Sequence, residues 1–164
     1  TTVAEIAKRA GLTERTFFRY FSDKREVLFS GSRELERELS LALSRTPHSL
    51  SPIDAVGWAL TAIAPLLPIR REVSRRRQAV ISANPELQER ERIKLASLAG
   101  TLAAGLRHRG VKEPAASLAA EMGVTVFRIG FERWASEALD RDLAYYMRES
   151  MDELKALTTG TSSN

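Results

Sequence analysis

Side chains that can contact a nucleic acid are gathered near the N-terminus of this 164-residue chain. Six residues between positions 13 and 19 supply two hydroxyls, two guanidinium groups, a carboxylate and an aromatic ring: Thr13, Glu14, Arg15, Thr16, Phe18 and Arg19. Arginine forms rigid, two-pronged hydrogen bonds with phosphate and with guanine. A hydroxyl at a helix start lies where free backbone N–H groups can hold a phosphate. This combination favours recognition of a polyanion.

Residue types that catalysis or metal binding would need are scarce. The chain has no cysteine, which excludes disulfides, thiolate metal sites and thiol nucleophiles. Its two histidines, His48 and His108, are far apart in the sequence, and there are no paired catalytic carboxylates and no phosphate loop. We therefore expect no enzyme activity, no metal and no cofactor. The net charge of +4, carried mostly by arginine, suits a polyanionic partner.

Two short helices and a longer one are expected to position these side chains. A helix is predicted over 2–10, with Thr2 and Glu5 as a capping box and Gly11 as its stop. Further helices are predicted over about 13–20, with Thr13 as N-cap, and over about 23–44. This is the layout of a helix-turn-helix DNA reader.

The spacing of small, aromatic and basic residues in this segment is similar to a known DNA-binding signature. The similarity rests on Ile6-Ala7-x-x-Ala10-Gly11-Leu12-Thr13, on Thr16-Phe17-Phe18-Arg19-Tyr20-Phe21, and on Lys24 and Leu28. The segment resembles the DNA-binding domain of the TetR family of bacterial transcriptional regulators. The all-helical remainder agrees with that family in the number and lengths of its helices. More weakly, 83–134 is similar to the C-terminal domain of actinobacterial members of the mycofactocin-regulator type.

The resemblance implies roles for the polar residues of the segment. Contacts that position the DNA backbone are expected from Thr2, Thr13 and Lys24. Base contacts are expected from Arg15, Thr16 and Arg19. Phe18 is expected to pack on sugar-phosphate or on a thymine methyl group, and Glu14 lies on or near the groove-facing side. Leu12, Phe17 and Phe21 are expected to fill the small core.

The segment departs from the family pattern in two ways. Phe18 stands where the family usually has tyrosine, and the missing hydroxyl removes a phosphate hydrogen bond worth roughly 1–1.5 kcal/mol; Tyr20 stands where the family usually has histidine. Family members also have a helix before 2–10 that closes a three-helix domain. We expect that helix to lie upstream of Thr1, and we expect weak DNA binding from a chain that begins at Thr1.

The rest of the chain also reads as helix. Ser51-Pro52 opens a helix that runs towards Pro65, and more helices are predicted over about 69–83, 84–109 and 113–139, and from Asp140 or Asp142 to Leu157. We expect an all-α fold in which a helix-turn-helix DNA-binding domain, 1–29, precedes a helical ligand-binding and dimerisation domain, 30–157. The polar tail, 158–164, is expected to be disordered.

The helix over 114–138 is apolar nearly all round, which predicts burial on two sides. One stripe is small, and the other is large and suits a core: Ala120, Val124, Phe127, Phe131 and Trp134. Helix-turn-helix dimers place two recognition helices about one DNA turn, ~34 Å, apart. We therefore predict a homodimer interface built from the last two helices, with these candidates: Ala119, Gly123, Val126, Gly130, Leu143, Met147 and Leu154. The alternative is that both stripes are core of a single chain.

A ligand pocket is implied by the family resemblance. The candidate lining residues are apolar, so we expect an apolar or amphipathic small molecule: Trp58, Ile63, Leu67, Met122, Phe127, Phe131 and Trp134. Plain core packing is the alternative for each. The run Ile69 to Gln78 carries five arginines. It reads as a solvated helix face, as an addition to the positive field near DNA, or as a holder for an anionic part of the ligand such as phosphate.

These observations favour a cytoplasmic one-component regulator, most simply a repressor. The homodimer is expected to bind a palindromic, double-stranded operator and to be released by a small molecule. A second interpretation is a helical structural or protein-interaction domain that does not bind DNA. The longest uncharged apolar runs fall short of the ~20 residues that a membrane span needs, so no membrane association is expected.

Overall fold

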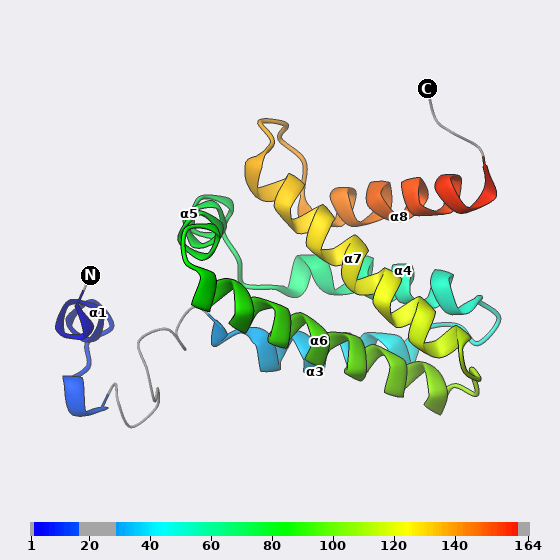
Figure 1. Ribbon diagram of the computed structural model, residues 1–164, viewed down its shortest axis with the longest axis horizontal. Coiled ribbons are helices and arrows are strands. Elements are labelled where there is room, and N and C mark those ends of the chain that lie inside the picture. Colours follow the sequence, from blue (N-terminus) through cyan, green and yellow to red (C-terminus); the bar gives the residue numbers. More distant parts are fainter. Residues whose placement is uncertain (1, 17–28, 161–164) are drawn as a thin grey trace. The chain divides into compact units, whose positions relative to one another are not determined.

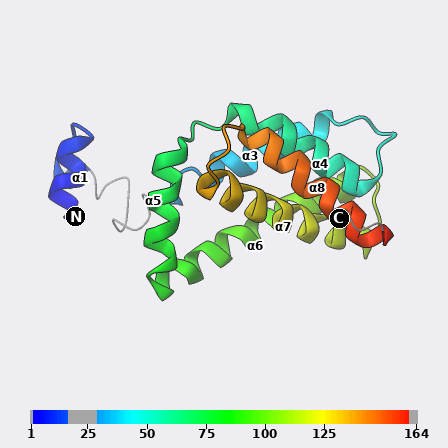
Figure 2. The ribbon, with the colours of Figure 1, turned by 90° about the horizontal axis from the view of Figure 1, so that it is seen from above.

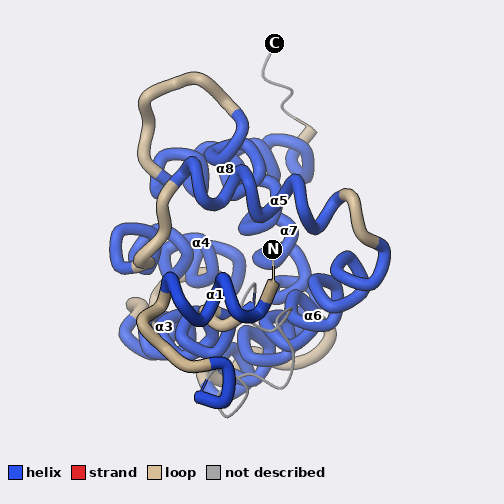
Figure 3. Tube along the Cα trace, turned by 90° about the vertical axis from the view of Figure 1, so that its left-hand side faces the viewer, coloured by secondary structure: helices blue, strands red, loops and turns tan. Residues whose placement is uncertain are grey.

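The computed structural model describes residues 2–16 and 29–160, and it divides into two compact units, Thr1–Arg33 and Glu34–Asn164. Every regular element in the described ranges is a helix (Figures 1 and 3). The predicted all-α fold is therefore confirmed. No single helix in these ranges is long and apolar enough to cross a membrane, although one pair bent by 113°, Pro52–Leu66 with Arg71–Ser82, passes by length and composition together.

The described part of the first unit holds α1, Val3–Arg9, and the beginning of a second helix at Glu14–Thr16. The second unit contains most of α3 (Ser32–Arg45) and all of the later elements. These are α4 (Pro52–Ile63), the 3-10 turn η2 (Ala64–Leu66), α5 (Arg71–Ser82), α6 (Pro85–His108), α7 (Ala115–Ser136) and α8 (Leu143–Thr159).

The predicted helix starts are confirmed where a side chain caps the first turn. The Ser51 hydroxyl accepts a hydrogen bond from the Asp54 N–H at 3.2 Å. The Asn84 amide oxygen accepts from two N–H groups of α6, and the Asp142 carboxylate accepts from the Tyr145 N–H at 2.9 Å. These bonds satisfy N–H groups that have no partner within the helix. Capping is a local interaction, so the sequence alone can predict it.

The core of the second unit is built around α7, which crosses the unit between α6 and α8 and also packs on α4 (Figure 2). Gly123 lets α7 approach its neighbours closely. A Cβ at this position would overlap the Val56 side chain of α4 and lie 3.3 Å from Leu102 Cδ1 of α6. The largest fully buried side chains include Leu39, Leu60, Ile63, Leu98, Leu106 and Tyr146.

An arginine at the end of α6 holds the end of α3. Arg109 donates to the carbonyl oxygens of Leu43 and Thr46, at 3.1 and 2.7 Å, and to that of Pro47 at 2.8 Å. The last carbonyls of a helix have no partner within it. Arg109 therefore completes the C-terminus of α3 and ties it to α6.

Three predicted boundaries are wrong. The helix predicted over 23–44 does not include 29–31, which lie outside α3, and α3 begins at Ser32; the Ser30-Gly31 pair there is a poor helix former. The helix predicted to reach Leu139 ends at Ser136, because Glu137 is extended. The polar tail was expected from 158, but α8 continues to Thr159, and the hydroxyls of its last two threonines bond to carbonyls of the preceding turn.

Candidate nucleic-acid interface and surface pocket

The end of α1 forms a tight reversal. The Thr2 N–H donates to Glu5 Oε2 at 2.8 Å and the Thr2 hydroxyl accepts from the Glu5 N–H, so the predicted capping box is present. At the other end, the Gly11 N–H reaches the Lys8 carbonyl and the Leu12 N–H reaches that of Ala7, at 3.1 and 2.8 Å. Gly11 has φ +70°, a conformation that costs other residues energy. This pair of bonds is a Schellman motif, and it ends the helix as predicted.

The next helix starts at Glu14 behind a threonine cap. The Thr13 hydroxyl accepts a hydrogen bond from the Thr16 N–H at 3.2 Å and lies 2.8 Å from the Thr16 hydroxyl. Because the cap engages Thr16, the N–H groups of Glu14 and Arg15 point out of the first turn without an intrahelical partner. A helix start of this kind is suited to holding a phosphate oxygen.

The predicted DNA contacts lie at the surface wherever the structure describes them. Thr2, Thr13, Glu14 and Arg15 are exposed, and Thr16 is half-buried. The other predicted contacts lie outside the described residues: Phe18, Arg19 and Lys24. One expectation for the small core is wrong, because Leu12 is 37% exposed, while Ala7 is fully buried as a small residue near a crossing should be.

The predicted ligand-binding residues do not converge on one cavity. Ile63 is buried in the core, Leu67 is half-buried against it, and Trp58 and Met122 are exposed on the outside of their helices. Only the aromatic residues of α7 lie together: the Phe127 and Phe131 rings are 5.9 Å apart, and those of Phe131 and Trp134 are 5.5 Å apart. This row packs along α7 as side chains three and four positions apart do.

The residues predicted for a dimer interface are mostly core residues of the single chain. Gly130 of the small stripe faces α8, where a Cβ would lie 3.2 Å from the Tyr146 carbonyl oxygen and 3.3 Å from Met147. The others are also buried within the chain, except Leu154, which is half-buried: Ala119, Gly123, Val126, Leu143 and Met147. The stripe of small residues therefore serves close packing inside one chain, because the neighbours it meets are α4, α6 and α8. The apolar residues that α7 leaves exposed are others: Leu118, Met122 and Ile129.

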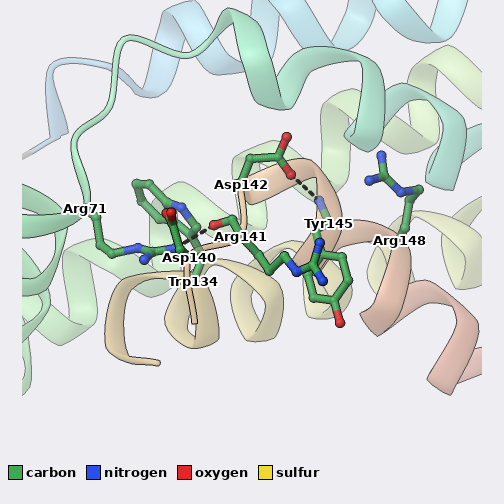
Figure 4. Close-up of a pocket in the computed structure, with 7 residues that line it drawn as sticks. All are labelled: Arg71, Trp134, Asp140, Arg141, Asp142, Tyr145 and Arg148. Carbon is green, nitrogen blue, oxygen red and sulfur yellow. Dashed lines mark hydrogen bonds between the residues drawn. The ribbon is translucent and has the colours of Figure 1, made fainter. Parts of the chain in front are cut away.

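A pocket of about 700 Å³ lies where the start of α5 meets the α7–α8 connection (Figure 4). Its lining combines three arginines, two aspartates and two aromatic rings: Arg71, Trp134, Asp140, Arg141, Asp142, Tyr145 and Arg148. Only Trp134 belongs to the predicted ligand set. Arg71 belongs to the arginine-rich run Ile69 to Gln78, one interpretation of which was that it holds an anionic part of a ligand. No cluster of potential metal ligands occurs in the described part of the chain.

Arg71 joins α5 to the far end of the pocket. Its guanidinium donates to the carbonyl oxygens of Leu139 and Arg141, at 3.0 and 2.5 Å, and it lies over the Trp134 ring with its central carbon 5.6 Å from the ring centroid. One turn further along α5, Arg75 donates to the Ala135 carbonyl at 2.9 Å. Two residues of the arginine-rich run therefore hold the end of α7 and the loop that follows. Neither contact is that of a freely solvated helix face, which was one of the three interpretations of the run.

Behind the pocket, a group of charges connects α7 to α8. Arg133 donates to Glu137 at 2.8 Å and pairs with Glu149 of α8 at 2.8 Å. The Arg133 guanidinium lowers the pKa of the Glu137 carboxyl below its usual range. Burial raises the pKa of the Tyr146 hydroxyl, and the negative charge of Glu137 raises it further. These contacts fix the two ends of the connection that carries the pocket.

The fold and the capped N-terminal turn define a helix-turn-helix protein with a helical second unit. Residues 1–30 match the family described as bacterial regulatory proteins, tetR family. A transcriptional regulator from Rhodococcus sp. Rha1 has a similar crystal structure, with a TM-score of 0.56 and 27% identity over 99% of this chain and 88% of that one. The N-terminal segment therefore matches the TetR family, and the chain is similar in fold to a transcriptional regulator over nearly its whole length.

Another solved structure has the same fold. Thermus thermophilus FadR, a TetR family transcriptional repressor in complex with lauroyl-CoA, gives a TM-score of 0.56 and 24% identity over 100% of this chain and 86% of that one. No curated protein sequence matches the chain. The similarity to the mycofactocin-regulator type stays a prediction.

Proposed function

We propose that the protein is a one-component repressor that binds a palindromic operator as a homodimer and leaves it when a small molecule binds. The observation that carries the proposal is the N-terminal segment that matches the family. A capped helix, a Gly11 turn and a second capped helix support it, because the exposed Arg15 and Glu14 lie at the start of that second helix, which we propose as the recognition helix.

The dimer is proposed to form through the outer face of α7. Leu118, Met122 and Ile129 are spaced by four and seven residues, which places them on one side of the helix, and all three are exposed in the single chain. Thr125 lies between them on the same side and is half-buried. A row of exposed apolar residues along a whole helix suits a self-complementary contact about a two-fold axis.

The effector is proposed to be an amphipathic small molecule. A ligand that binds one arrangement of the helices about 5- to 150-fold more tightly than another supplies the ~1–3 kcal/mol that allosteric coupling needs. Lauroyl-CoA, the ligand of Thermus FadR, is a suitable first compound to test, because it joins an apolar chain to a charged group.

Fluorescence anisotropy of the natural protein with labelled DNA from its own promoter region tests the DNA-binding proposal. We expect saturable binding that depends on sequence and weakens steeply with salt. Binding of equal strength to scrambled DNA, or no binding at all, would favour the helical interaction domain instead. Titration of lauroyl-CoA into the complex then tests release, and a compound that binds the protein without changing operator affinity is not the effector.

A further inference from the structure

The pocket between α5 and the α7–α8 connection has an excess of positive charge. Three guanidinium groups line it against two carboxylates. One of these carboxylates, Asp142, is already engaged as the N-cap of α8. Arg71 bonds to carbonyl oxygens, which orient its guanidinium but do not neutralise it. A negatively charged group that entered the pocket would be attracted by this charge.

Like Arg71, the other two arginines have no acidic partner among the described residues. Neither Arg141 nor Arg148 forms an ion pair with a carboxylate in residues 2–16 and 29–160. Both side chains belong to exposed residues, so both can reach a ligand. Some other surface arginines of the unit do form ion pairs, as Arg92 does with Glu89 at 2.7 Å and Arg128 with Glu132 at 3.4 Å.

Aromatic rings hold two of the guanidinium planes in place. Arg71 lies over Trp134, and Arg141 lies over Tyr145 with its central carbon 5.1 Å from the ring centroid (Figure 4). Stacking on a ring occupies the face of a guanidinium and leaves its N–H edge free for an oxyanion. Because the ring limits the motion of the side chain, less entropy is lost when a ligand binds.

The start of α5 adds to the positive field. Its N-cap, Arg70, makes no side-chain capping bond, so no side chain of the cap covers the first N–H groups. Arg71 is the first residue of this helix and lines the pocket. The partial positive charge of a helix N-terminus favours an anion beside it.

We propose that this pocket binds the phosphate group of a small organic phosphate, with Arg141 and Arg148 as its main hydrogen-bond donors. Arg71 supplies a third positive charge and carries the contact to α5. The volume of about 700 Å³ suits a small molecule and not a macromolecule. The inference rests on the proposed function and deepens it, since it names the chemistry of one part of the effector. Its test uses no DNA, so the phosphate site and the DNA-binding proposal can fail independently.

The test follows the fluorescence of Trp134 while inorganic pyrophosphate is added at constant ionic strength. The chain has two tryptophans, so the background Trp58→Phe leaves Trp134 as the only one. In that background we compare the unaltered pocket with Arg141→Gln plus Arg148→Gln. The matched control is Arg92→Gln, which removes an arginine of α6 outside the pocket. Thermal unfolding by circular dichroism checks that each variant is folded.

We expect saturable binding that the double variant weakens at least about tenfold, as the loss of charge-assisted hydrogen bonds should. The control is expected to bind within about twofold of the parent, because the control arginine does not line the pocket. A response that does not saturate overturns the proposal, since it would reflect general surface charge. An equal loss in the control variant overturns it as well.

Discussion

Asp54 in the first turn of α4 and Lys155 near the end of α8 form an ion pair, although 101 residues separate them in the sequence. Lys155 and the Ser51 hydroxyl lower the pKa of the Asp54 carboxyl. The pair is partly exposed, so its contribution to stability is modest. It joins two helices that both pack on α7.

The Asp54–Lys155 pair should make the stability of the second unit depend on pH. Since the pKa of Asp54 is lower in the folded state, its contribution is present above the unfolded pKa and is lost as the pH falls through the folded value. We expect Asp54→Asn to lower stability at pH 7 by ~1 kcal/mol or less and to have no effect in acid. Thermal unfolding at both pH values measures this, with the exposed Asp152→Asn as control.

Replacement of Gly11 tests the turn in the DNA-binding segment. Gly11→Ala should destabilise the reversal by ~1–2 kcal/mol, because φ +70° is strained for alanine. No atom lies within 4 Å of the added Cβ, so strain alone would act. Gly31→Ala is the matched control, since its Cβ also meets nothing within 4 Å and its φ is not positive. Hydrogen exchange of the α1 amides reports the difference, and equal protection in both variants would contradict it.

Two glycines within helices should respond in opposite directions to the same change. Gly123→Ala places a Cβ against Val56 and Leu102 and should cost ~1–3 kcal/mol. Gly100→Ala adds a methyl group to an open position on α6 and should stabilise the helix by ~0.5–1 kcal/mol. Urea unfolding of the two variants measures both values. A neutral Gly123→Ala variant would contradict the close packing of α7 against α4.

Arg15 and Arg19 are both expected to read bases, and Arg15 is the one that lies within the residues the structure describes. Arg15→Ala should weaken operator binding by ~1–3 kcal/mol and relax the preference for one base position. Arg92→Ala removes the same charge from α6 and should leave the sequence preference intact. Anisotropy with operators altered at single positions separates a base contact from a general loss of charge. A uniform loss across all sequences would make Arg15 a phosphate contact instead.

The exposed apolar row of α7 should carry the dimer. Ile129→Arg introduces a charge at the proposed two-fold contact and should convert the dimer to a monomer. Ile93→Arg makes the same change at an exposed position of α6 and should leave the dimer intact. Light scattering gives the mass of each variant. A monomeric mass for the unaltered protein would contradict the proposed dimer interface on α7.

Local signals in the sequence were sufficient to predict where several helices begin and end. The capping side chains of Ser51, Asn84 and Asp142 act within one turn, so the starts of α4, α6 and α8 could be predicted. Gly11 and Gly110, both with positive φ, mark two helix ends for the same reason. The start of α3 at Ser32 was missed, because the apolar periodicity from Val27 to Leu43 favoured one continuous helix.

Contacts between distant segments could not be predicted in the same way. The small stripe of α7 fits a dimer seam and an internal seam equally well, and only the positions of Val56, Leu102 and Met147 decide between them. The pocket depends on Arg71 bonding to carbonyl oxygens near Leu139, and a backbone oxygen carries no sequence signal. Recognition of the DNA-binding segment succeeded because its side-chain spacing lies within one short stretch.

The three hydrogen bonds from Arg109 also determine how α3 can move. A slide of α3 along its own axis would break the bonds to the carbonyls of Leu43, Thr46 and Pro47, each of which is strengthened by the arginine charge. Arg109 is thus an anchor that ties the C-terminal end of α3, the end opposite Ser32, to the end of α6.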